Sequence, residues 1–194
     1  MKRDIILAGV GGQGILTIAA AIGTAAVNKG LYLKQAEVHG MSQRGGDVQS
    51  NLRISDKPIY SDLIAKGGAD VILSVEPMEA LRYLPLLKES GYVITNTKPF
   101  VNIPNYPEMD KLMEKIEGLK NKVALDADKI AREDIGSARA SNIVMLGAAL
   151  PVLGFEVEEL ENAIRELFGR KGEKIVEMNI KALHAGREFA EKNM

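Results

Sequence analysis

The stretch Gly9-Val10-Gly11-Gly12-Gln13-Gly14 decides the fold class of this chain. It follows a short apolar run, Ile5 to Ala8, which predicts a buried parallel strand. It precedes an Ala-rich segment, Ile15 to Asn28, which predicts a helix that stops at Lys29-Gly30, because glycine is favoured just after a helix. Leu31 to Ala36 predicts a second strand, so strand, glycine loop, helix and strand form one βαβ unit.

The middle of the chain continues this alternation. Val48 to Ile54 alternates apolar and polar residues and, with Pro58-Ile59-Tyr60 after the turn Ser55-Asp56-Lys57, predicts an antiparallel hairpin. Further buried strands and helices are predicted from apolar runs and periodicity. The strands are Ala69 to Val75, Tyr92 to Asn96 and Val123 to Asp126, and the helices run from about Met78 to Glu89 and from about Glu108 to Gly118.

From Ser141 onward the pattern is helical. The three predicted helices are Ile143 to Val152, Val157 to Phe168 and Gly172 to Lys192. We therefore predict one α/β domain over residues 1–194, with a Rossmann-like, doubly wound, mostly parallel sheet, a β-hairpin insertion and a helical C-terminal region.

The amino-acid composition excludes several kinds of binding site and function. A formal net charge of -1 gives no basic excess for nucleic-acid binding. Cysteine is absent, which excludes disulfides, Cys-ligated zinc and any Cys-held iron–sulfur cluster within this chain. The two histidines, His39 and His184, form no ligand pattern, so we expect no metal site. The sequence contains no signal-peptide pattern and no apolar span of membrane length, so we expect a cytoplasmic protein without a membrane partner.

The first glycine loop has two interpretations. Its GxGxxG pattern lies between a strand and a helix, where backbone N–H groups and the helix dipole favour an anion. Glu37, at the end of the second predicted strand, lies near the position of a ribose-binding acid. The pattern is therefore typical of NAD or flavin binding, although the glycines also suit close helix packing or a protein–protein contact.

A second glycine-containing loop follows, from Glu37 to Asp47. It carries Ser42, Gln43 and Arg44 beside Gly45 and Gly46, a set that suits an anionic ligand held by the arginine, the hydroxyl and backbone N–H groups. The alternative is a solvated surface hairpin. Glu37 either orients a ligand hydroxyl or pairs with Arg44.

At this point the chain resembles a known family. The loops GVGGQG (9–14) and EVHGMSQRGG (37–46), with the stretch from Ala140-Ser141-Asn142-Ile143 to Leu146-Gly147-Ala148, resemble the gamma-type subunit or domain of the 2-oxoacid:ferredoxin oxidoreductases. The length and helical C-terminal region most resemble the beta-subunit branch that acts on indolepyruvate. The resemblance spans essentially the whole chain.

The resemblance implies a reaction and a distribution of the cofactors between subunits. A 2-oxoacid, here indolepyruvate or another aryl pyruvate, is decarboxylated oxidatively to an acyl-CoA, and ferredoxin is reduced. The complex is expected to use thiamine diphosphate, magnesium, iron–sulfur clusters and coenzyme A. This chain has neither cysteine nor a thiamine diphosphate motif, so a larger partner subunit is expected to carry those groups. The chain itself is expected to complete the active site, to contact coenzyme A and to be inactive alone.

The expected ligand-contacting residues all lie in the two glycine loops, and no catalytic residue is assigned. They are Gly11, Gly12, Gln13, Gly14, Ser42, Gln43, Arg44, Gly45 and Gly46. Outside the loops, His39 suits a structural role, Asn142 an N-cap, and Glu76-Pro77 the start of a helix. Two rival hypotheses remain: a stand-alone NAD- or flavin-binding oxidoreductase that uses the first loop with Glu37, and a small-molecule-binding regulatory module.

Overall fold

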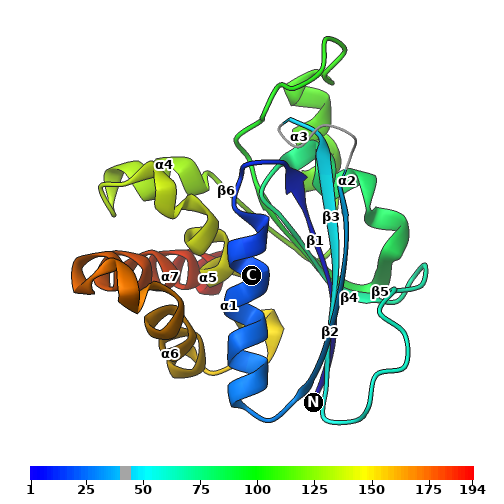
Figure 1. The fold of residues 1–194 in the computed structure, drawn as a ribbon. Coiled ribbons are helices and arrows are strands. Elements are labelled where there is room, and N and C mark those ends of the chain that lie inside the picture. Colours follow the sequence, from blue (N-terminus) through cyan, green and yellow to red (C-terminus); the bar gives the residue numbers. More distant parts are fainter. Residues whose placement is uncertain (40–44) are drawn as a thin grey trace.

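A computed structural model describes residues 1–39 and 45–194 of the chain. Within these residues one sheet has the strand order β2-β3-β1-β4-β5-β6 (Figure 1). Strand β3 pairs antiparallel with β1 and β2, whereas β1, β4, β5 and β6 pair in parallel. The strands are β1 (Lys2–Val10), β2 (Tyr32–His39), β3 (Asp47–Ser55), β4 (Ala69–Ser74), β5 (Leu87–Asn96) and β6 (Lys122–Leu125).

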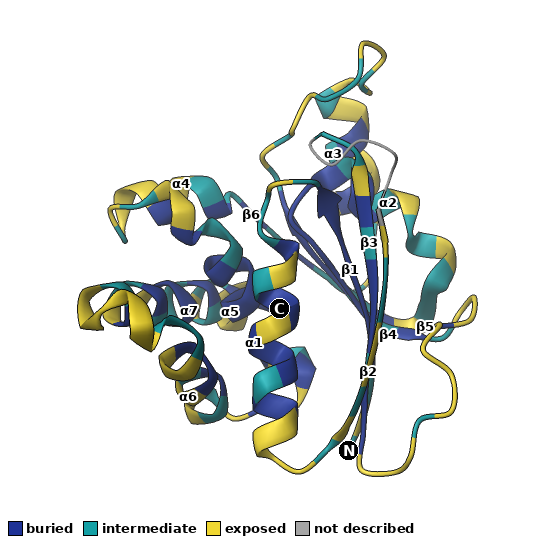
Figure 2. Ribbon diagram, in the orientation of Figure 1, coloured by how far each residue is buried: buried dark blue, intermediate teal, exposed yellow. Residues whose placement is uncertain are grey.

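Helices cover both faces of this sheet, and its central strands are buried (Figure 2). One face packs against α1 and α4 to α7 through the larger core, and the other packs against α2 through a smaller one. Helix α3 contacts α2 and β6. This arrangement confirms the predicted fold class. The helices are α1 (Ile15–Asn28), α2 (Pro77–Arg82), α3 (Met109–Glu117), α4 (Ala127–Glu133), α5 (Ser141–Leu153), α6 (Val157–Phe168) and α7 (Glu173–Asn193), with short 3₁₀ turns at Leu84–Leu86, Ala138–Ala140 and Gly169–Lys171.

The predicted hairpin exists, but its predicted partner strand is wrong. Strand β3 pairs with β2 along its whole length, from Tyr32 opposite Ser55 to His39 opposite Val48, and residues 58–60 form no strand. Pro58 has no N–H to contribute to a ladder. Strand β3 lies between β1 and β2, so the two parallel strands of the βαβ unit are not direct neighbours.

Two helix predictions also need correction. The helix expected from Met78 to Glu89 ends at Arg82, and β5 already begins at Leu87. Pro85 accounts for this, because proline lacks the amide donor of a helix interior and disfavours the helical conformation of the residue before it. Helix α4 was not predicted. Its N-cap is Asp126, whose carboxylate accepts the Lys129 N–H at 2.8 Å.

The C-terminal helices are held by an unusually close crossing of α5 and α7. A Cβ added at Gly147 would lie 2.0 Å from the Leu183 carbonyl oxygen, and one at Gly186 would lie 1.9 Å from the Val144 carbonyl oxygen. Only glycine lets the two backbones come this close. This crossing anchors α5, whose first turn reaches the glycine loop.

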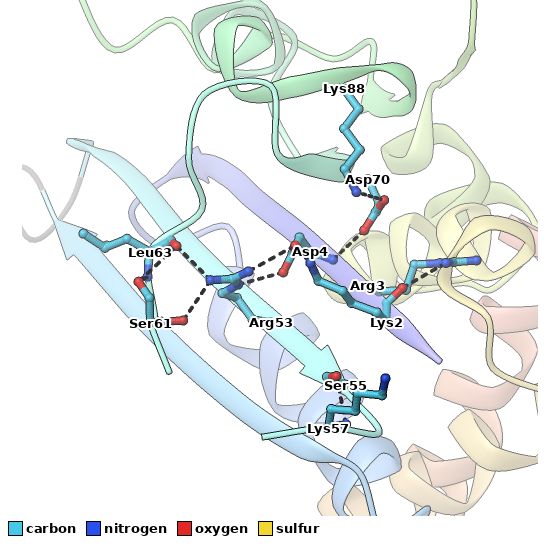
Figure 3. A network of polar contacts seen from close by, with 10 residues as sticks. All are labelled: Lys2, Arg3, Asp4, Arg53, Ser55, Lys57, Ser61, Leu63, Asp70 and Lys88. Carbon is cyan, nitrogen blue, oxygen red and sulfur yellow. Dashed lines mark hydrogen bonds and ion pairs between the residues drawn. The ribbon is translucent and has the colours of Figure 1, made fainter. Parts of the chain in front are cut away.

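A partly buried ion pair between β1 and β3 also holds the loop before β4 (Figure 3). Arg53 Nε donates to Asp4 Oδ1 at 2.7 Å, and the same guanidinium donates to the carbonyls of Ser61 and Leu63. Burial raises the pKa of Asp4, but hydrogen bonds and charges from Arg53 and Lys2 together outweigh burial and hold that pKa below its ordinary value. The pair therefore stabilises the sheet at neutral pH.

Two kinds of feature are absent from residues 1–39 and 45–194. Neither range contains a helix that is both long and apolar enough to cross a bilayer. Nor does either contain a group of three or more side chains that could hold a metal ion.

Candidate functional site

The first glycine loop forms the predicted turn between β1 and α1. Gly14 is the N-cap of α1 and has φ of +81°, and Gly12 has φ of +101°. Both values lie in the region that side chains disfavour. A Cβ at Gly14 would also lie only 2.5 Å from Asn142 Nδ2. The loop therefore needs glycine at position 14 for its backbone conformation and for the close approach of α5.

The side chain of Gln13 stabilises the first glycine loop through hydrogen bonds to the backbone. The Val10 N–H donates to Gln13 Oε1 at 2.8 Å, and Gln13 Nε2 donates to the Val75 carbonyl at 3.4 Å. The side chain thus links the carboxyl ends of β1 and β4. Because both polar atoms of its amide already have backbone partners, this geometry gives Gln13 a structural role, and its predicted ligand contact stays a prediction.

The two glycine loops lie against each other. The Gly11 N–H donates to the Gly46 carbonyl at 2.9 Å, and the Gly45 N–H donates to the Gly11 carbonyl at 3.5 Å. The ends of the second loop that the structure describes therefore join the first loop, as a shared site requires. The remaining residues predicted there, Ser42, Gln43 and Arg44, lie outside the described residues, as does the side chain of His39.

The loop opens onto a cavity at the topological switch point of the sheet. From β1 the chain passes through α1 to β2 on one side, whereas β4 lies on the other side of β1. Ligands in open α/β sheets bind at the carboxyl ends of the strands at such a point. A cavity of about 320 Å³ lies there, lined by residues 12–14 and by Asn96, Phe100, Asp128, Arg139 and Asn142.

A second cavity, of about 290 Å³, lies on the other side of the glycine loop. Gly11, Gly12 and Leu16 line it together with Val48 of β3 and Glu37 of β2. Glu37 is therefore close to the glycine loop, where the rival dinucleotide hypothesis places its ribose-binding acid. The glycine loop forms part of the wall of both cavities.

The electrostatics of the 320 Å³ cavity favour an anion. Helix α1 begins at this cavity, and its first N–H groups have no side-chain cap. Helix α5 also begins there, but a 3₁₀ turn precedes it, and the Ser141 N–H donates to the Ala138 carbonyl. Arg139 is exposed beside them and makes no hydrogen bond or ion pair with the described part of the chain. Asp128 brings one negative charge, and its carboxylate accepts a hydrogen bond from Asn96 Nδ2 at 2.8 Å.

Asn142 does not cap α5 as predicted. The N-cap is Ala140, and Asn142 lies in the first turn of the helix. Its Nδ2 donates to the Gly14 carbonyl at 3.3 Å instead. The prediction failed because the sequence places a polar residue before an apolar run but does not show that a second loop lies within its reach.

The predicted helix start at Glu76-Pro77 is confirmed, and Glu76 has a further role. Its carboxylate is fully buried and accepts the N–H of Glu79 at 2.9 Å, the N–H of Phe100 at 3.3 Å and the hydroxyl of Tyr106. Burial and this hydrogen bond raise the pKa of Tyr106 above its ordinary value. Glu76 thereby fixes the segment of residues 97–108 over the ends of the strands.

That segment also reaches the second glycine loop. Asn102 Nδ2 donates to the Gly45 carbonyl at 2.7 Å, and Phe100 lines the 320 Å³ cavity. Sequence reasoning missed Phe100, Asn96 and Arg139. A usable signal existed only for Asn96, which ends a buried strand, because strand ends in α/β sheets meet at the ligand site.

A more spacious hollow than either of these cavities lies elsewhere. It is an open groove of about 660 Å³ between α2 and α3, with Leu81 and Leu112 on its walls and Lys111 and Lys115 at its margin. It shares no residue with the described parts of the two glycine loops. We do not assign the site to this groove, because size alone does not bring functional groups together.

Comparison with known proteins agrees with this geometry. Residues 4–189 match the family model described as pyruvate ferredoxin/flavodoxin oxidoreductase. The indolepyruvate oxidoreductase subunit IorB of Archaeoglobus fulgidus is 40% identical, over 96% of this chain and 94% of that protein. The ketoisovalerate oxidoreductase subunit VorA of Methanothermobacter marburgensis is 30% identical, over 97% of this chain but only 36% of that protein.

A solved structure extends the similarity to three dimensions. The gamma subunit of a keto/oxoacid ferredoxin oxidoreductase from Geobacter sulfurreducens superposes with a TM-score of 0.74 at 27% identity, covering 98% of this chain and 99% of that one. Sequence motifs, sheet topology and full-length relatives thus agree. The chain belongs to the pyruvate ferredoxin/flavodoxin oxidoreductase family.

Proposed function

We propose that this chain is a subunit of a 2-oxoacid:ferredoxin oxidoreductase. Its complex decarboxylates indolepyruvate, or a related aryl pyruvate, to an acyl-CoA and passes the electrons to ferredoxin. Full-length similarity to an indolepyruvate oxidoreductase subunit supports the substrate class. The observation that carries the site is the pair of glycine loops, which are joined by backbone hydrogen bonds beside an anion-favouring cavity.

The proposal divides the chemistry between subunits. This chain contains no cysteine and cannot hold an iron–sulfur cluster through thiolates. A larger partner subunit therefore carries the clusters, the thiamine diphosphate and its magnesium. The chain matches only about a third of VorA, so in that relative the same unit is part of a much longer polypeptide. This similarity supports the proposal that the present chain of 194 residues functions in contact with other subunits and is inactive alone.

Within the complex, this chain binds and orients coenzyme A and closes the site against water. Coenzyme A carries phosphate groups, and the cavity offers the uncapped N-terminus of α1 and the guanidinium of Arg139, which has no hydrogen-bond or ion-pair partner among residues 1–39 and 45–194. Arg44 of the second loop supplies a further fork of donors to a phosphate or carboxylate. No catalytic residue is assigned to this chain.

The test is reconstitution. The chain is co-expressed with a candidate larger, cysteine-rich subunit, and the purified complex is assayed for ferredoxin reduction with indolepyruvate and coenzyme A. Activity is expected in the complex and not in the chain alone. The position of Glu37 favours the rival dinucleotide enzyme, so the isolated chain is also titrated with NAD(H) and flavins. Micromolar NAD binding with turnover by the chain alone contradicts the proposal.

Arg44 gives a sharper test of the second loop. Losing one charge-assisted hydrogen bond costs about 1.5–3 kcal/mol, so Arg44→Ala is expected to raise the KM for coenzyme A by about 10- to 150-fold. The melting temperature of the isolated chain stays unchanged. Arg170→Ala, which removes an exposed guanidinium from the turn before α7, is the matched control and leaves both quantities unchanged. An unchanged KM in Arg44→Ala disproves the anion role.

A further inference from the structure

One aromatic ring is left free at the candidate site. The chain has four phenylalanines, and Phe155, Phe168 and Phe189 all belong to or pack against the larger core. Phe100 instead is 43% exposed and lines the 320 Å³ cavity beside the glycine loop. An aromatic ring in a cavity wall offers a flat apolar face on which the ring of a ligand can stack. Its place in the cavity wall points to a ligand with a flat, apolar face.

The backbone holds this ring in place before any ligand binds. The Phe100 N–H donates to the buried Glu76 carboxylate, and the Tyr106 hydroxyl donates to the same oxygen. Asn102 ties the segment to Gly45. A side chain presented by such a fixed backbone loses little conformational entropy on binding. The ring is therefore a preorganised platform.

The polar groups of the same cavity narrow the ligand class. Arg139 is exposed there and unpaired within the described residues, which suits a phosphate. Asp128 is an acceptor, and only one of its two oxygens has a hydrogen-bond partner in the described part of the chain. A carboxylate accepts from the exocyclic amine of adenine, whereas it repels the carbonyl oxygen that replaces this amine in an oxopurine.

We infer that Phe100 stacks on the base of an adenine nucleotide whose phosphate faces Arg139. This deepens the proposed function and rests on it, since the adenine nucleotide is the 3′,5′-ADP portion of coenzyme A. Phe100 then sets the specificity for that portion. The pantetheine arm extends from the cavity toward the partner subunit, where the acyl group forms.

The experiment uses the assembled complex and measures equilibrium binding by calorimetry. The probes are coenzyme A, 3′,5′-ADP, its inosine analogue and 4′-phosphopantetheine, which lacks the nucleotide. Phe100→Ala is expected to weaken coenzyme A and 3′,5′-ADP by about 5- to 140-fold, the range that loss of one stacked base gives. Binding of 4′-phosphopantetheine stays unchanged, and Phe100→Trp restores affinity for 3′,5′-ADP. The wild type prefers 3′,5′-ADP to its inosine analogue.

One control variant and three outcomes decide whether Phe100 has this role. Val101→Ala removes the adjacent exposed side chain, which does not line the cavity, and is expected to change none of the affinities. Equal affinity of Phe100→Ala and wild type for 3′,5′-ADP overturns the inference, as does an equal loss for 4′-phosphopantetheine. A defect in assembly of Phe100→Ala also overturns it, because the ring then contacts the partner. If the wild-type chain forms no complex, the proposed function itself fails.

Discussion

Replacement of Gly14 by alanine tests the geometry on which the candidate site depends. Gly14 has φ of +81°, and its missing side chain leaves room for the Asn142 amide, which donates to the Gly14 carbonyl. An added Cβ would lie 2.5 Å from Asn142 Nδ2 and 3.2 Å from its Cγ. The substitution therefore strains the backbone and displaces the neighbouring side chain at once.

The two effects have separate magnitudes. A non-glycine residue in the left-handed region costs about 1–2 kcal/mol. Loss of the hydrogen bond from Asn142 costs about 0.5–1.5 kcal/mol. We therefore expect Gly14→Ala to lower the free energy of unfolding by roughly 1.5–3.5 kcal/mol. Gly30→Ala is the matched control, because Gly30 has φ of +74° but open space where its Cβ would lie, so it shows the strain alone.

A double-mutant cycle with urea denaturation separates the two effects. Asn142→Ala removes both the clash and the hydrogen bond, so Gly14→Ala in that background costs only the backbone strain. The double variant is expected to be more stable than the sum of the single changes predicts, by about 0.5–1.5 kcal/mol. The reasoning is refuted if the changes are additive and Gly14→Ala costs no more than Gly30→Ala.

The remaining predictions concern stability away from the site. Asp4→Asn leaves the Arg53 guanidinium without its buried counter-charge, and we expect a loss of about 3 kcal/mol in the free energy of unfolding at pH 7. Folding lowers the pKa of Asp4, so the stability of the wild type falls as the pH drops below about 3.8 and through the pKa of the folded state. Asp4→Asn lacks this part of the pH profile of stability. Equal pH profiles of the wild type and the variant contradict the role given to the Asp4–Arg53 pair. Gly186→Ala forces α5 and α7 apart and is expected to cost about 1–3 kcal/mol or more by overpacking. Thermal unfolding checks it against Gly169→Ala, whose Cβ meets nothing within 4 Å, and equal melting temperatures refute the close crossing.

Much of the fold could be predicted because its signals are local. The bounds of α1 and α6 match the predicted bounds, since helical periodicity and terminal glycines act within a few residues. The pairing of β3 could not be predicted in the same way. Its alternating pattern indicates a strand but not its neighbour, which is set by contacts with β1 and β2 that lie far apart in sequence.

In the candidate site, too, only the residues with a local sequence signal could be predicted. The glycine loops are visible in the sequence because glycine at fixed spacing has a backbone cause. The other cavity walls come from irregular segments: Phe100 from the chain after β5, and Arg139 from the turn before α5. Glu76 was predicted only as a helix start. Its burial and its hydrogen bonds from Phe100 and Tyr106, which lie 24 and 30 positions further along the chain, give no signal in the neighbouring sequence. Such residues emerge only once the sheet has brought the strand ends together.

The most direct test of the proposed function is a titration of the proposed larger, cysteine-rich subunit, purified by itself, with this chain. The assay records the initial rate of ferredoxin reduction with indolepyruvate and coenzyme A. We expect a rate near zero without the chain and a rise in rate that saturates at a fixed molar ratio of chain to partner. When Phe100→Ala replaces the wild-type chain, a higher concentration of coenzyme A is needed for half of the maximal rate. A partner that reduces ferredoxin at full rate without this chain contradicts the central claim.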